Sequence, residues 1–214
     1  SIRSFLIRAI SQDVSVVKNV LESEDVYSAI HCLKKLGVKI KKNGPKSYLI
    51  YGKGFGSLSA NKKLRLNFGN SGTLARLLIG ILSTTPNVEI IIQGDHSLNK
   101  RNMKKLIKLM SEFGAEFFPK NKFNFPLKLV STDMPIGIKY MAGSSAQLKS
   151  AVILAGLNSF GNTEIIEKNK SRDHTENMLI KNTQALKIKK GNKKIIKITG
   201  KTFLNPINFK IPGD

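Results

Sequence analysis

A weak internal repeat with a period of about 70 residues most constrains the fold of this chain. One kind of segment begins with small polar residues and continues as an apolar, helix-like run. It starts at Ser1, Asn70 and Gly143, with the sequences SIRSFLIRAIS, NSGTLARLLIGIL and GSSAQLKSAVILAGL. Because these runs are apolar nearly all round, we expect three helices that are buried on every side.

A second kind of segment follows each apolar run and has one apolar face. It starts at Val26, Asn102 and His174, with the sequences VYSAIHCLKKLGVKI, NMKKLIKLMSEFGAEF and HTENMLIKNTQALKIKK. The periodicity predicts an amphipathic helix in each case, often ending at a glycine before a strand and lying outside the buried helix.

Short stretches rich in isoleucine and valine, bounded by glycine, asparagine and proline, separate the helical segments. They are typical of strands, so each unit reads as strand, helix, strand, helix and two further strands. Three such units are predicted, at about residues 1–65, 66–138 and 139–214. The sequence therefore predicts one α/β domain of three βαβαββ repeats with pseudo-threefold symmetry and buried helices.

The composition suits a globular domain, with 214 residues of which 41% are hydrophobic. Cys32 is the only cysteine, so no disulfide can form within the chain, and we expect it in the core.

Charges interrupt every apolar run, which predicts no membrane span, and no signal peptide is recognised. We therefore expect a cytoplasmic protein. Because Ser1 begins directly in a helical pattern, we also expect a fragment of a longer chain.

The charge is strongly basic, with 36 Lys and Arg against 14 Asp and Glu, a formal net charge of +22. Such a surface attracts nucleic acid, acidic lipid or phosphorylated metabolites. Most of the lysines are equally well explained by a coding bias toward lysine. The scarce arginines are more informative, because their planar fork suits phosphate and carboxylate. They are Arg3, Arg8, Arg65, Arg76, Arg101 and Arg172.

Two polar segments around the second buried helix are candidate anion sites. Asn70 to Thr73 lie where a strand ends and the helix begins, with Arg76 on an otherwise apolar run. A helix start offers free N–H groups and a positive dipole end, although simple capping by Asn or Ser explains the segment too. The loop from Gly94 to Met103 carries Lys100 and Arg101 before the next helix, and it is either a phosphate clamp or a solvated basic loop.

Two further candidates lie in the third unit. Gly143 to Ser150 places serines and a glutamine at a helix start, and Lys170 to Met178 contains Ser171 and Arg172. Each is also explained as a helix cap. In a threefold domain, however, the helix starts of all units can converge on one face, which favours a shared anion site over separate caps.

The sequence gives little or no support for a metal, nucleotide or nucleic-acid site. The three histidines have no spacing typical of metal ligands, so we predict no metal and no cofactor. The sequence has no phosphate-binding P-loop, no dinucleotide fingerprint and no nucleic-acid motif with interleaved aromatic residues.

The segments NSGTLARLL, GDHSLNKRNM, SAQLKSAVILAGL and SRDHTENM, in this order, resemble the 5-enolpyruvylshikimate-3-phosphate synthase family, the 3-phosphoshikimate 1-carboxyvinyltransferases of the shikimate pathway. The resemblance covers the whole chain and implies the first of two similar domains. It implies transfer of the enolpyruvyl group of phosphoenolpyruvate to the 5-hydroxyl of shikimate 3-phosphate, with release of phosphate. Both substrates would bind between the domains of a monomeric parent, without nucleic acid, membrane or cofactor.

The resemblance also implies site residues. For shikimate 3-phosphate they are Arg3, Ser145, Gln147, Ser171 and Arg172. For phosphoenolpyruvate they are Asn70, Gly72, Thr73, Arg101 and Gln147. No catalytic residue is assigned, because the family's Asp-Lys-Ser before the first helix would precede Ser1, and its acid/base carboxylates belong to the second domain. A chain with half of the cleft is expected to be inactive alone.

The sequence departs from the family pattern at Asn102, where proline is usual, and at Ala146, where some members have serine. Gly72 stands where glyphosate-tolerant members often have alanine, so the parent is expected to be glyphosate-sensitive. Two alternatives remain. The related UDP-N-acetylglucosamine enolpyruvyl transferases carry a cysteine in the loop that here runs from Gly94 to Met103 without one. A basic nucleic-acid-binding module is supported only by the net charge.

Overall fold

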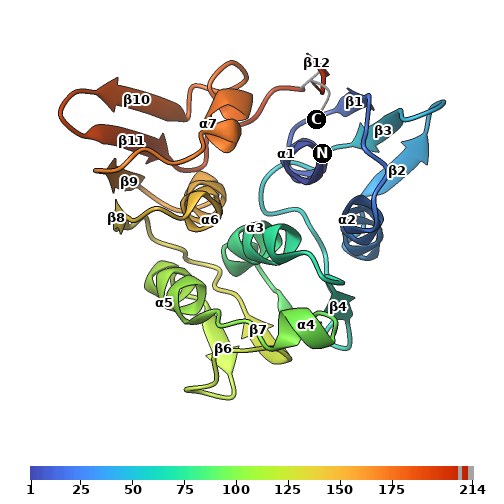
Figure 1. Cartoon of the computed structure of the whole chain (residues 1–214), viewed down its shortest axis with the longest axis horizontal. Helices are drawn as coiled ribbons and strands as arrows, with labels where there is room; N and C mark the ends of the chain where they lie inside the picture. Colours follow the sequence, from blue (N-terminus) through green and yellow to red (C-terminus); the bar gives the residue numbers. More distant parts are fainter. Residues whose placement is uncertain (207–208, 212–214) are drawn as a thin grey trace.

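The computed structural model describes residues 1–206 and 209–211, shown in Figure 1. The first part of the chain forms α1 (Ile2–Ala9), β1 (Val14–Lys18), α2 (Glu24–Lys35), β2 (Lys39–Lys42) and β3 (Tyr48–Tyr51). The middle part forms β4 (Arg65–Asn67), α3 (Gly72–Ser83), β5 (Glu89–Gln93), α4 (His96–Asn99), α5 (Lys104–Phe113), β6 (Glu116–Phe118) and β7 (Leu127–Val130). The last part forms β8 (Lys139–Ala142), α6 (Ala146–Leu157), β9 (Asn162–Glu167), α7 (His174–Leu179), β10 (Leu186–Lys190), β11 (Lys194–Thr199) and β12 (Phe209–Lys210).

The described strands make three four-stranded sheets with the same internal order. The orders are β12-β1-β3-β2, β4-β5-β7-β6 and β8-β9-β11-β10. In each sheet the first pair is parallel and the other pairs are antiparallel. In the first sheet β12, from the far end of the chain, has the place that β4 and β8 have in the others. The prediction of a mixed α/β fold is confirmed.

Helices α1, α3 and α6 lie in the middle of the molecule, with the sheets around them (Figure 1). Helix α3 packs against both α6 and α1. From Leu74 to Ser83 every residue except Arg76 is buried, and all residues of α6 from Leu148 onward are buried. A Cβ on Gly80 would lie 2.7 Å from the backbone oxygen of Ala151, so the close approach of α3 and α6 requires glycine. The expected burial of these helices is confirmed.

Helices α2 and α5 are the amphipathic helices expected from the second kind of segment. Ser23 caps α2 by accepting a hydrogen bond from the backbone N–H of Val26, and acidic residues follow in the first turn. Helix α5 is capped at its carboxyl end by Gly114, whose φ of 115° belongs to the left-handed region. Within the described part of the chain, no helix has the length and apolarity that a membrane span needs.

The third amphipathic segment differs from its prediction as a helix over residues 174–190. Helix α7 ends at Leu179, and Leu186–Lys190 form strand β10 instead. Two polar side chains after α7 bond to backbone carbonyls, Asn182 back to the last turn and Thr183 to a later loop, which stops the helix. The alternating apolar and lysine positions that follow then pair in register with β11.

Candidate functional site

Gln147, in the first turn of α6, joins the start of that helix to the start of α3. Its Oε1 accepts a hydrogen bond from Arg76 Nη1 at 2.9 Å, and its Nε2 donates to Thr73 Oγ1 at 2.9 Å. Arg76 Nη1 also donates to the backbone oxygen of Gly72 at 3.1 Å. The one arginine of α3 therefore ties two helix starts together.

Two guanidinium groups flank Gly72. A Cβ on this residue would lie 2.7 Å from Arg76 Nη1 and 2.8 Å from Arg101 Nη1. Arg101, in the loop before α5, donates from Nη2 to Asn70 Oδ1 at 2.9 Å. Burial, and then the positive charge of Arg101, lower the pKa of Arg76. Two like charges held this close at a helix start favour an anion between them.

Ser71 and Ser145 act as caps in the same region. Ser71 Oγ accepts from the backbone N–H of Leu74 at 3.2 Å, and Ser145 Oγ accepts from that of Leu148 at 3.3 Å. The capping interpretation is thus correct for both serines. It does not compete with ligand binding, since a hydroxyl that accepts one bond can still donate another.

An open pocket of about 420 Å³ lies beside these helix starts. It brings Ser145 and Gln147 together with Arg76 and with the loop and first turn that follow Arg101. Its lining residues are Arg76, Asn102, Met103, Lys104, Lys105, Leu106, Ser145, Gln147 and Leu148. The lining is cationic, with no carboxylate, which suits an anionic small molecule.

Arg3 connects α1 to the start of α7. Its Nε donates to Thr175 Oγ1 at 3.1 Å, and Thr175 Oγ1 lies 2.7 Å from Ser150 Oγ in α6. The pKa of Arg3 is lowered by burial first. Glu176 raises it and the neighbouring positive charge of Arg172 lowers it further, with a net lowering. A second pair of arginines therefore lies at this end of the molecule, and the Arg172 side chain is exposed.

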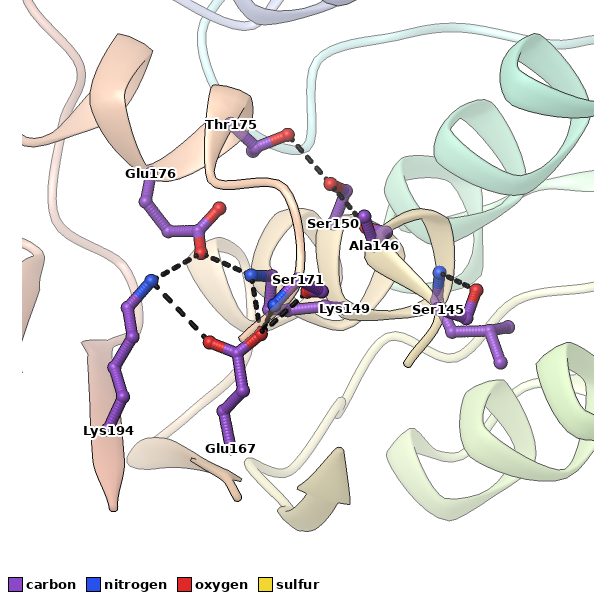
Figure 2. Close-up of polar contacts among 10 residues, drawn as sticks. Ser145, Ala146, Lys149, Ser150, Glu167, Ser171, Thr175, Glu176 and Lys194 are labelled. Carbon is purple, nitrogen blue, oxygen red and sulfur yellow. Dashed lines mark hydrogen bonds and ion pairs between the residues drawn. The ribbon is translucent and has the colours of Figure 1, made fainter. Parts of the chain in front are cut away.

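Ser171 lies against a buried cluster of charges (Figure 2). Glu167 Oε1 accepts from both the hydroxyl and the backbone N–H of Ser171, at 2.6 and 2.8 Å. Lys149 Nζ lies 3.0 Å from Glu167 Oε1 and 2.7 Å from Glu176 Oε1. Lys194 Nζ contacts the same two carboxylates.

The structure thus arranges the predicted residues as two groups that meet at α6. The first group surrounds the start of α3 and consists of Asn70, Gly72, Thr73, Arg101 and Gln147. The second group surrounds the start of α7 and consists of Arg3, Ser171 and Arg172. Helix α6 connects them, because Ser145 and Gln147 border the pocket on one side while Ser150 bonds Thr175 on the other.

The sequence singled out Arg76 beside the segment 70–73, but it did not indicate three further charged residues that shape these groups: Lys149, Glu167 and Glu176. Lys149 was detectable, because it is the one charge in the apolar run of α6, where a charge needs a buried partner. Its partners were not detectable, since they come from β9 and α7.

Cys32 is fully buried, and burial raises its pKa to about 12, as suits a core residue. Among residues 1–206 and 209–211, no three or more His, Cys, Asp or Glu side chains gather in a way that could hold a metal ion.

Comparison with known proteins gives one consistent result. Residues 1–214 match the family model described as EPSP synthase (3-phosphoshikimate 1-carboxyvinyltransferase). The 3-phosphoshikimate 1-carboxyvinyltransferase of Paramagnetospirillum magneticum is 39% identical over 178 residues, 83% of this chain and 40% of the relative. That of Parvibaculum lavamentivorans is 35% identical over 215 residues, 99% of this chain and 47% of the relative.

A solved EPSP synthase from Acinetobacter baumannii superposes on the whole chain with a TM-score of 0.89 and 34% identity. The chain covers 47% of that structure. It therefore spans about half the length of the proteins it matches.

Proposed function

Because this chain belongs to the EPSP synthase family, we propose that it supplies the shikimate 3-phosphate half of a 3-phosphoshikimate 1-carboxyvinyltransferase active site. In that reaction the 5-hydroxyl of shikimate 3-phosphate adds to phosphoenolpyruvate, and the tetrahedral intermediate then loses phosphate. The product is the enolpyruvyl ether, and the pathway is that of aromatic amino acid biosynthesis. Since the chain spans about half of its relatives, it is inactive alone.

The observation that carries this proposal is the pairing of arginines at helix starts. Arg76 and Arg101 flank Gly72 at the start of α3. Arg3 and Arg172 lie close enough near α7 for Arg172 to lower the pKa of Arg3. A multiply charged anion removes the repulsion within each pair and gains charge-assisted hydrogen bonds. Both substrates of the proposed reaction carry phosphate and carboxylate groups.

The two groups of residues divide between the two substrates. Phosphoenolpyruvate is assigned to the first group, where Arg101 neutralises an anionic group and Gly72 permits close approach to the backbone. Asn70 holds Arg101 in place, and Thr73 holds Gln147. Gln147 lies between the groups and is shared by both substrates.

Shikimate 3-phosphate is assigned to the second group and to Ser145 and Gln147 at the start of α6. Arg3 and Arg172 supply positive charge for its phosphate and carboxylate, and Ser145 and Ser171 supply hydroxyl groups for its oxygens. Holding two anions side by side at fixed cations supplies proximity and charge compensation. The residues that move protons lie outside this set.

We also propose that about residues 1–65, 66–138 and 139–214 form three βαβαββ repeats related by pseudo-threefold symmetry, the first of which begins with α1 and takes its first strand, β12, from the end of the chain. The identical strand orders of the three sheets support this. The parent protein would be a cytoplasmic monomer. Its second domain would close over the starts of α3, α6 and α7. The alternative of UDP-N-acetylglucosamine transfer is disfavoured, because the whole chain matches the EPSP synthase family instead.

Calorimetric titration of this chain with shikimate 3-phosphate at moderate salt tests the proposal. Arg172→Ala should weaken binding by about 1.5 kcal/mol, as expected for a charged hydrogen bond. Arg65→Ala is the matched control, because Arg65 is exposed on β4, outside the site, and carries the same charge. Equal losses in both variants would show that only net charge matters.

The alternative function, a basic nucleic-acid-binding module, leads to a different expected binding result. It would bind duplex DNA or RNA with a steep dependence on salt and would show no selective, saturable binding of shikimate 3-phosphate.

A further inference from the structure

Four charged side chains form a buried, electrically neutral cluster between α6, β9, α7 and β11. Lys149 and Glu176 are fully buried, Glu167 is 1% exposed and Lys194 is 17% exposed. The nitrogen-to-oxygen distances are 3.0 and 2.7 Å for Lys149, and 3.5 and 3.2 Å for Lys194. Each lysine therefore contacts both carboxylates, as Figure 2 shows.

Fold stability alone does not account for this cluster. Removing four charges from water costs about as much free energy as their mutual attraction returns, and well-packed apolar side chains of similar size stabilise a fold at least as well. A cluster of this kind is better explained if one of its members has a second task.

Glu167 has such a task in its contact with Ser171. Its Oε1 accepts from three donors: Lys149 Nζ, the Ser171 hydroxyl and the Ser171 backbone N–H. Glu167 is the last residue of β9, and Ser171 lies four residues later. The carboxylate thus closes the connection between β9 and α7 onto the end of the strand.

The backbone bond matters more than the hydroxyl bond for a ligand site. If a ligand oxygen accepts the Ser171 hydroxyl proton, the bond from that hydroxyl to Glu167 is lost. The backbone N–H bond does not involve the side chain, so it can still hold the loop and the adjacent Arg172. Burial raises the pKa of Glu167, but hydrogen bonds from Ser171 and Lys149 outweigh burial and lower it, so the carboxylate stays ionised. An ionised carboxylate is the stronger acceptor.

We propose that Glu167 is a positioning residue, which holds Ser171 and Arg172 where they bind shikimate 3-phosphate, with Lys149 and Lys194 as its counter-charges. The proposal rests on the function proposed above, because that function assigns the ligand. It adds a residue that contacts no substrate and acts only through Ser171.

Two double variants separate positioning from stability. Lys149→Met/Glu167→Met removes the acceptor of Ser171 and leaves the pair Lys194–Glu176. Lys149→Met/Glu176→Met also removes one positive and one negative charge, but it leaves the pair Lys194–Glu167, with both bonds to Ser171. Both clusters stay neutral and gain two methionines, so each variant is the control of the other.

Two measurements are made on each variant, beside its urea unfolding midpoint. Calorimetry should show shikimate 3-phosphate binding about tenfold weaker in the Glu167 variant than in the Glu176 variant. Hydrogen exchange of the Ser171 backbone amide should be fast in the Glu167 variant, and protected in the Glu176 variant and the wild type. Lys149→Met/Glu167→Gln, which restores an acceptor without the charge, should recover much of that protection.

Equal binding losses and equal exchange rates in the two double variants would overturn the proposal. If the Lys149→Met/Glu167→Met variant does not fold, the Lys149→Met/Glu167→Gln variant decides. Its weaker, neutral acceptor should protect the Ser171 amide only in part, and exchange and binding equal to those of Lys149→Met/Glu176→Met would overturn the proposal. If the wild type does not bind shikimate 3-phosphate, the proposed function fails. The exchange rates then still show whether Glu167 holds Ser171.

Discussion

Arg3 Nε donates a hydrogen bond to Thr175 Oγ1 at 3.1 Å and joins two residues that are 172 positions apart. The hydroxyl of Ser150 donates to the backbone oxygen of Ala146 at 2.8 Å, so the Thr175 hydroxyl donates to Ser150 Oγ. The Thr175 oxygen is then left to accept from Arg3. The result is a directional chain of hydrogen bonds from α1 through α7 to the first turn of α6, which orients the Nε edge of the Arg3 guanidinium.

Thr175→Val tests this orientation with little change in volume. Without the acceptor, Arg3 loses its fixed direction, and shikimate 3-phosphate binding should weaken by about 1 kcal/mol, roughly fivefold. Calorimetry measures the effect. Thr85→Val is the control, because Thr85 is equally buried, donates to the backbone oxygen of Ile81, and lies beyond the far end of α3. An equal loss in the control would contradict the role of Thr175.

Gly72→Ala should disturb the first group of site residues. The added Cβ would lie within 3 Å of the Arg76 and Arg101 guanidinium groups, both of which are flexible ends that can move aside. Folding should therefore survive, while phosphoenolpyruvate binding in the presence of shikimate 3-phosphate weakens about tenfold through the displaced Arg101. Gly143→Ala, where a Cβ meets nothing within 4 Å, should leave binding unchanged.

Glyphosate inhibition of the full-length parent is a separate prediction from Gly72. The parent with glycine at this position should be inhibited, and Gly72→Ala should reduce the inhibition. Full activity of the unaltered parent at high glyphosate would contradict this expectation.

Lys149→Met alone should destabilise the fold by about 3–5 kcal/mol, because two buried carboxylates are left with one lysine. Urea unfolding measures the loss, and adding Glu176→Met should recover most of it by restoring neutrality. Lys120→Met breaks the exposed pair with Glu116 and should cost less than about 1 kcal/mol. Similar costs for Lys149→Met and Lys120→Met would show that the cluster is not tightly coupled.

Acid unfolding should depend on Glu167. Burial raises the pKa of this carboxyl, but hydrogen bonds from Ser171 and Lys149 outweigh burial, so the net pKa lies below its usual value of 4.5. A lowered pKa stabilises the fold above pH 4.5, and this contribution disappears as the pH falls through the folded-state pKa. The free energy of unfolding should therefore fall more steeply below pH 4.5 in the wild type than in Lys149→Met/Glu167→Met. Parallel curves would contradict the lowered pKa.

The difference between prediction and structure is clearest at residues 174–190. The run HTENMLIKNTQALKIKK has apolar residues at helical spacing on either side of the polar stretch 181–184, and its last residues also alternate with period two. Both patterns are local, so the sequence offers no means of choosing between them. Pairing with β11, which arrives later in the chain, makes Leu186–Lys190 a strand.

The sequence alone determined the elements whose cause is local. The apolar runs of α3 and α6 predicted buried helices, because a run that is apolar on all sides has no face for water. Their polar starts and the order of four motifs indicated the family, which the match over the whole chain confirmed. Helix starts with serine caps were also readable, since capping involves residues only three positions apart.

The tertiary structure alone decided which of these pieces meet. Strand β12 completes the first sheet beside β1 from the opposite end of the chain. Packing of α1, α3, α6 and α7 brings together the side chains that bond to one another. Arg3 donates to Thr175 and Arg76 donates to Gln147. Lys149 pairs with Glu167 and Glu176. Contacts between distant residues depend on how helices and sheets pack together, and periodicity within a segment carries no information about that packing.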